Sequence, residues 1–277
     1  AISISADGRY TSSSLGKLQS GRGRDVYTDG ANNYYVSDLG LDVVRLSDLS
    51  NIGYAEKENG FTSVVSFGGR IYLGSDEGIW EINTDDLSGE YDLSTPALTT
   101  FTYPRLISNN ILDIHGRLID GKQYLVIGTD KGAQLISNLS GSSYSTTFKY
   151  NDDDNITKVW LNEDGDLAYY NATTKKVCIY QDAISSDLYF EQIGTSSYTR
   201  YYDQSTTPTL MDNIVNDLVY SANTSTAQTG SNTLYVGTRN GLSVVQEHST
   251  MASGTVKHYV AKVAYDERTG LFVPLSS

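Results

Sequence analysis

One segment shows how this chain is organised: Leu234-Tyr235-Val236-Gly237-Thr238-Arg239-Asn240-Gly241-Leu242-Ser243-Val244-Val245. Two short apolar runs flank a polar loop that ends in Gly241. Runs of this kind, joined by a short loop containing glycine, are typical of a β-hairpin. Glycine fits the last loop position because it readily adopts the positive φ that closes a tight turn. The segment therefore predicts a pair of antiparallel strands.

The same unit recurs along the chain. Three further copies carry Asp38 and Gly40, Asp76 and Gly78, and Asp130 and Gly132 in the places of Arg239 and Gly241. A fifth copy, residues 167–180, lacks the glycine but keeps two apolar runs around a polar loop. Consecutive copies lie 38 to 67 residues apart. One blade of a β-propeller takes about 40 to 50 residues, and longer spacings are explained by loop insertions.

Residues ahead of the hairpins carry a family resemblance. The segment from Asp212-Asn213-Ile214 to Gly241-Leu242 resembles the propeller repeats of two-component-regulator sensor proteins. The segment from Asn110-Ile111 to Gly132 is a second close copy. The resemblance covers about residues 23–263 and implies a β-propeller fold. It implies little about function, because one fold hosts many functions.

We therefore expect a single all-β domain over residues 1–277, a propeller with five four-stranded blades or, as the alternative, six. The predicted blades span approximately residues 23–60, 61–107, 108–152, 153–197 and 210–265. The chain ends, residues 1–10 and 266–275, are expected to pair and close the ring. An unpaired blade edge would leave backbone donors and acceptors exposed, which favours such closure.

Composition excludes several classes of function. The net charge of −13 and the pI near 4.5 argue against a nucleic-acid partner, which needs a basic face. No apolar run of about 18 residues is present, so we expect no membrane insertion. Cys178 is the single cysteine, and His115, His248 and His258 lack the spacing of metal ligands. The acidic, Tyr-, Ser- and Thr-rich composition favours an extracellular or virion setting.

Aromatic residues suggest one binding site. Tyr198, Arg200, Tyr201 and Tyr202 fall in a predicted loop between the fourth and fifth blades. Tyr and Arg are favoured binding anchors because they are large and amphipathic, and aromatic faces also stack on sugars. The alternative interpretation is that these tyrosines cover a blade edge.

Aspartates suggest two further sites, each with a simpler explanation. Asp38, Asp76 and Asp130 would decorate one face of the ring, where they could bind cations; the favoured interpretation is that each caps its own turn. The calcium candidates are Asp152, Asp154, Asp164 and Asp166. Oxygen-rich clusters suit Ca²⁺, but the helix–loop–helix calcium motif is absent and the two pairs are expected at opposite ends of one strand. No cofactor is therefore predicted.

A glycosidase remains an alternative. The segment Arg24-Asp25-Val26-Tyr27 resembles the first-blade segment of arabinanase-type enzymes, which implies that Asp25 would be the base. Such chemistry needs a second carboxylate about 5 to 9.5 Å away. Glu56, Glu58 and Glu81 are available, but none lies in a recognisable motif.

The sequence thus predicts a non-enzymatic interaction propeller of a virion or extracellular surface assembly, which binds protein partners through its blade loops. A secreted, lectin-like module that binds glycans is the first alternative. A five-bladed glycosidase is the second.

Overall fold

The structure is a computed structural model. It describes residues 22–184 except 86, 103, 138, 140–144 and 152, residues 199–246 except 207–208 and 223–231, and five terminal strands. These residues form strands and no helix.

The strands fall into five larger sheets and two terminal hairpins within the described residues. The first sheet holds β3 (Gly23–Thr28), β4 (Asn32–Ser37), β5 (Gly40–Arg45), β6 (Asn51–Glu56) and β10 (Gly89–Glu90); the second holds β7 (Ser63–Phe67), β8 (Arg70–Ser75) and β9 (Gly78–Asn83). The third holds β11 (Ile111–Ile119), β12 (Lys122–Thr129), β13 (Gly132–Ser137) and β14 (Ser145–Asn151); the fourth holds β15 (Ile156–Leu161), β16 (Leu167–Asn171), β17 (Lys176–Tyr180) and β18 (Thr199–Tyr202). The fifth holds β19 (Val215–Ser221), β20 (Thr233–Thr238), β21 (Gly241–Gln246) and β22 (Thr255–Tyr259). The hairpins are β1 (Ile2–Ile4) with β2 (Tyr10–Ser12), and β23 (Val263–Asp266) with β24 (Leu271–Pro274).

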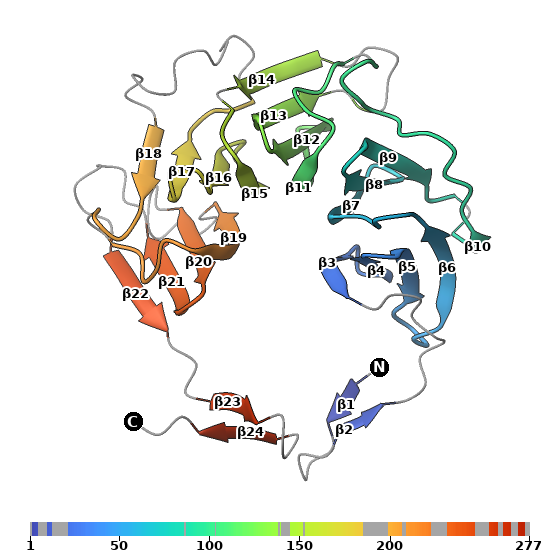
Figure 1. Cartoon of the computed structure of the whole chain (residues 1–277), viewed down its shortest axis with the longest axis horizontal. Coiled ribbons are helices and arrows are strands. Elements are labelled where there is room, and N and C mark those ends of the chain that lie inside the picture. Colours follow the sequence, from blue (N-terminus) through green and yellow to red (C-terminus); the bar gives the residue numbers. More distant parts are fainter. Residues whose placement is uncertain are drawn as a thin grey trace.

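The five sheets stand side by side around a common centre (Figure 1). Their first strands form the inner ring: β3 packs against β7, β7 against β11, β11 against β15, and β15 against β19. Successive strands within each sheet pair antiparallel and lead outward. The two terminal hairpins lie in the remaining gap of the ring, between the first and fifth sheets.

The hydrophobic core lies between neighbouring sheets. Alternate residues of a strand point to opposite faces of its sheet, so each sheet contributes one apolar set to each neighbour. Val126, Ala133 and Leu135 of the third sheet pack with Val159 and Leu161 of the fourth. The other face of the fourth sheet packs in the same way on the fifth. Burial of both faces explains why these strands read as near-continuous apolar runs rather than alternating ones.

The second sheet departs from a plain four-stranded meander. After β9 the chain runs to β10, which pairs in parallel with β6 on the outer edge of the first sheet. The chain then returns to β9, where Leu98 forms a bridge with Ile79. The outer position of the second sheet is therefore held by a single bridge instead of a strand.

Two sequence expectations about the chain course need comment. The predicted loop at residues 198–202 is wrong for its described part, because Thr199–Tyr202 is β18, the outer strand of the fourth sheet. The predicted fourth blade, 153–197, therefore ended before its last strand. In the described residues each terminal hairpin pairs within itself, so closure by pairing of the chain ends and the blade number remain predictions.

Candidate functional site

A hydroxyl group holds each glycine-containing turn. Thr129 Oγ1 accepts the Lys131 N–H at 3.0 Å and donates to Gly132 O at 2.9 Å. Ser37, Ser75 and Thr238 make the same pair of hydrogen bonds in their own copies. In the degenerate copy the Asn171 side chain accepts the Thr174 N–H. The expectation that Asp38, Asp76 and Asp130 cap these turns is therefore wrong, because the preceding Ser or Thr already satisfies the turn.

The residue after the hydroxyl instead ties the turn to the segment that leads into the first strand of its own sheet. Asp38 Oδ1 accepts the Arg22 N–H at 3.0 Å. In the fifth sheet the residue after the hydroxyl is the donor instead, and Arg239 Nε donates to Asp212 Oδ2 at 3.1 Å. Asp130 Oδ1 has no hydrogen-bond partner among the described residues.

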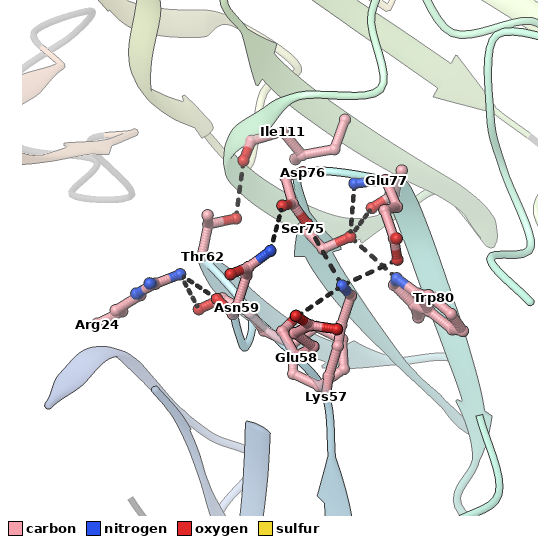
Figure 2. A network of polar contacts seen from close by, with 12 residues as sticks. Arg24, Lys57, Glu58, Asn59, Thr62, Ser75, Asp76, Glu77, Trp80 and Ile111 are labelled. Carbon is pink, nitrogen blue, oxygen red and sulfur yellow. Dashed lines mark hydrogen bonds and ion pairs between the residues drawn. The ribbon is translucent and has the colours of Figure 1, made fainter. Parts of the chain in front are cut away.

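Asp76 belongs to the largest of these links (Figure 2). Lys57 Nζ lies 3.3 Å from Asp76 Oδ1 and 2.9 Å from Glu77 Oε2, and it sits 5.6 Å from the centre of the Trp80 ring. Asn59 donates to Asp76 Oδ2 at 3.2 Å. The Lys57 side chain is largely buried while the two carboxylates remain exposed. This network fixes the connection between the first and second sheets.

Charged residues occupy one shared position on the inner ring. A β-bulge near the start of β3, β11, β15 and β19 places Asp25, Asp113, Lys158 and Asp217 in the same register. Ser63 of β7 occupies the matching place, paired with Gly74. We call these five residues the inner-ring position. Bulges re-aim side chains, and here they bring one cation among three carboxylates.

Two inner-ring carboxylates join neighbouring sheets. Asp25 Oδ2 accepts the Val64 N–H at 2.9 Å, and Asp113 Oδ2 accepts the Val159 N–H at 2.8 Å. The acceptor in each case belongs to one sheet and the donor to the next. Lys158 Nζ lies 3.8 Å from Asp113 Oδ1. These aspartates therefore act as hydrogen-bonded links between sheets.

Burial shifts the proton affinity of this group. It raises the pKa of Asp113 to about 7, against the opposing effects of Lys158 and the Val159 N–H. Burial also raises the pKa of Asp25. For Lys158, burial acts to lower the pKa, but the charges of Asp113, Asp217 and Asp25 outweigh it and raise the pKa. Asp113 can therefore exchange a proton near neutral pH.

Two residues further along β11 and β15, His115 and Trp160 form a second contact between the third and fourth sheets. Their rings stack with centroids 4.0 Å apart, and His115 Nδ1 accepts the Leu161 N–H at 3.2 Å. Burial, with a smaller effect of Arg117, lowers the pKa of His115 to about 3, so the imidazole is neutral. That hydrogen bond places the proton on Nε2.

The predicted binding residues are not brought together as a loop site. Tyr202 is buried between the fourth and fifth sheets. Tyr201 is exposed, but Lys176 Nζ lies 4.1 Å from its ring centre. Arg200 pairs with Ile179 in the ladder, and Tyr198 lies outside the described residues. Binding of a partner by these residues stays a prediction.

The calcium candidates are separated along β15. Asp154 precedes the strand, and its Oδ2 accepts from Asn171 at 2.7 Å. Asp164 and Asp166 follow the strand, where Asp166 accepts from the Asp182 N–H and from Asn232. Asp152 lies outside the described residues. In the described part of the chain no group of three or more His, Cys, Asp or Glu side chains could hold a metal ion.

Sequence reasoning named Asp25 but missed Asp113, Lys158 and Asp217. A signal was present: the inner strands begin Gly-Arg-Asp-Val, Ile-Leu-Asp-Ile, Ile-Thr-Lys-Val and Val-Asn-Asp-Leu. A charged residue recurs at the third place of each and is followed by an apolar one. Only the pairing register shows that these charges face one another.

Comparison with known proteins shows the fold. No family model and no curated protein matches the chain. A solved structure of PorZ, a surface component of the type-IX secretion system of Porphyromonas gingivalis, superposes with a TM-score of 0.53 at 14% identity, over 93% of this chain and 29% of PorZ. Hydrazine synthase of Kuenenia stuttgartiensis superposes with a TM-score of 0.56 at 10% identity, over 89% of this chain and 69% of the enzyme chain.

These two neighbours are β-propeller-like proteins, and this chain shares their fold type. The chain spans less than a third of the length of the PorZ structure. The propeller fold implied by the sensor-repeat resemblance is supported, whereas a sensor relationship is not shown. The described residues include no helix that could span a membrane.

Proposed function

We propose that this chain is a non-enzymatic interaction module, a propeller that contacts protein partners through its loops in an extracellular or virion surface assembly. One observation carries the proposal. Leu39, Phe101 and Ile214 are large apolar side chains exposed in loops. Leu39 lies in the turn between β4 and β5, and Ile214 directly precedes the inner strand β19. Phe101 follows Thr99, which lies against Gly78 in the turn between β8 and β9. These turns and the starts of the inner strands are on the same face of the ring. We call this the turn face. Contiguous apolar patches bordered by polar residues mark protein contact sites, and the proposal is that these three side chains contribute to one such surface.

The inner-ring aspartates support a structural role over catalysis. A glycosidase would need Asp25 free to act on substrate or water. Both of its oxygens instead accept backbone hydrogen bonds, Oδ1 from Val26 at 2.8 Å and Oδ2 from Val64 at 2.9 Å. PorZ, a solved structure similar to this chain, is a surface component of a secretion system, which is compatible with an interaction role.

The interaction proposal is tested in the source of the protein with a tagged chain. The chain should be recovered in an assembly heavier than itself, measured by native mass spectrometry. Changing Leu39, Phe101 and Ile214 to Ser should release it, while the matched change Leu118→Ser, at the far end of β11, should not. Recovery of the unmodified chain only as a free monomer would contradict the proposal.

The two alternatives have their own tests. Release of sugar from a polysaccharide panel, abolished by Asp25→Asn, would establish the glycosidase and overturn the proposal. Binding on a glycan array, lost on Tyr201→Ala, would favour the lectin. Tyr201 is exposed and Tyr202 is buried in the described part of this group, but Lys176 already lies over the Tyr201 ring.

A further inference from the structure

One face of the fifth sheet is left uncovered. Tyr259 and Tyr202 occupy the same register position in the fifth and fourth sheets, yet Tyr259 is 53% exposed and Tyr202 7%. Tyr235 corresponds in the same way to Ala168, and the exposures are 40% and 0%. The fourth-sheet residues are buried because the fifth sheet covers them. The fifth sheet has no such cover in the described structure.

The first sheet is uncovered on its opposite face. Val26 is 57% exposed. The residues at its register position on the other four inner strands are 2–5% exposed: Val64, Ile114, Val159 and Leu218. Each of those four is covered by the sheet before it. The gap between the fifth and first sheets (Figure 1) is thus bordered by the face that carries Tyr235 and Tyr259 and by the face that carries Val26.

Asp217 shows the same incompleteness in its hydrogen bonding. Asp25 and Asp113 each bond their own next residue or Lys158 on one side and the inner strand of the following sheet on the other. Asp217 accepts the Leu218 N–H at 2.9 Å, as Asp25 accepts that of Val26. Among the described residues it accepts no hydrogen bond from a following sheet, and it is exposed. Its register calls for a further inner strand beyond β19.

The uncovered face is hollowed. A groove of about 340 Å³ runs over β20, β21 and β22, lined by Tyr235, Leu242, Val244, Lys257 and Tyr259 together with neighbouring polar residues. One interpretation of this groove is a binding site for a ligand. The register comparison favours another, since the same face of the fourth sheet forms a sheet-to-sheet interface.

We propose that the two terminal hairpins together form a sixth blade, which docks in this gap and closes the ring. They supply four strands, the number in the third, fourth and fifth sheets. Figure 1 places both in the gap. Three residues separate β22 from β23, close to the four that lead from β14 to the inner strand β15. β23–β24 therefore provides the inner pair against β19, and β1–β2 the outer pair.

Thiol labelling of the full chain tests this arrangement. Tyr235→Cys and Val26→Cys place probes on the two bordering faces. Ala168→Cys is the buried control at the matching register, and Phe101→Cys is the exposed control. The native Cys178 does not interfere, because burial raises the pKa of its thiol to about 11. Hydrogen exchange of the amides of β1, β2, β23 and β24 is measured in parallel.

The proposal predicts that both probes react at least about tenfold more slowly than Phe101→Cys, at a rate independent of protein concentration. It also predicts slow amide exchange in all four terminal strands. Reactive probes would show that the gap is open. Protected probes with fast-exchanging terminal strands would show that the fifth sheet docks directly on the first. Protection that appears only at high concentration, with a dimer mass, would show a second copy in the gap. Each of these three results overturns the sixth blade.

Discussion

At the scale of single residues, the hydroxyl of Ser75 holds one turn together. Its Oγ accepts from the Glu77 N–H and the Trp80 Nε1–H and donates to Gly78 O. Ser75→Ala should lower the free energy of unfolding by about 1–3 kcal/mol, because the Glu77 N–H, the Trp80 Nε1–H and Gly78 O lose their hydrogen-bond partner. Urea denaturation measures this. Ser63→Ala is the matched control: the Ser63 side chain is equally buried but its Oγ has no hydrogen-bond partner in the described structure, so its removal should cost little. Equal losses would contradict the role of the turn hydroxyl.

The raised pKa of Asp113 predicts that the stability of the fold depends on pH. Its pKa is about 7 in the folded chain and about 4 in the unfolded chain, so the folded state binds the proton more tightly. The contribution of this group to the free energy of unfolding therefore falls as pH rises from about 4 to 7. Asp113→Asn removes this titration while its amide oxygen can still accept the Val159 N–H. Urea denaturation at several pH values should show the variant gaining stability over the parent as pH rises. Parallel pH profiles would contradict the raised pKa.

At the scale of elements, close approach between sheets restricts one strand position. A Cβ at Gly128 would lie 2.5 Å from Ile156 O, a backbone atom of the next sheet. Gly128→Ala should therefore lower the free energy of unfolding by about 1–3 kcal/mol through overpacking. Gly23→Ala is the control, because a Cβ there meets nothing within 4 Å. Thermal and urea unfolding of both variants compare them. A harmless Gly128→Ala would mean that the third and fourth sheets lie further apart.

The hairpins were the most predictable elements, because turn chemistry and strand periodicity are both local. The Asp-x-Gly loops alone located the turns at 38–40, 76–78 and 130–132. Long-range pairing was not predictable in this way. The Tyr- and Arg-rich segment near residue 200 has the composition of a polar loop. It forms β18 because its backbone pairs with the otherwise open edge of β17. The parallel addition of β10 to the first sheet likewise has no local signal.

Sequence analysis identified one residue of the inner-ring position and missed the others. Asp25 attracted notice through a resemblance, and its carboxylate proves to bond the next sheet rather than stand free. Asp113, Lys158 and Asp217 escaped notice because nothing local marks a charge that faces a partner over 40 residues away. Their convergence depends on the register of four separate strands and on the β-bulge in each. A side-chain cluster of this kind becomes visible only after the sheets are placed around the ring.

At the scale of the whole molecule, the net charge of −13 opposes compaction. Self-repulsion of like charges destabilises the folded state, and salt screens it. Raising NaCl from about 0.01 M to 0.15 M shortens the screening length from about 30 Å to 8 Å and should raise the melting temperature. Differential scanning calorimetry at both concentrations checks this, with sucrose at matched osmolality as the uncharged control. A melting temperature that falls with salt would show that attractive ion pairs such as Lys57–Glu77 outweigh the net charge.

The central claim is that the sheets repeat around a ring with room for one more. An experimental structure of the full chain, by crystallography or electron cryomicroscopy, tests it most directly. We predict that successive sheets are related by rotations of about 60° about one axis, with the four terminal strands as the sixth sheet. Five sheets rotated by about 72°, with β19 against β3, would contradict the sixth blade. A two-layer stack or a linear coil of sheets would contradict the ring itself.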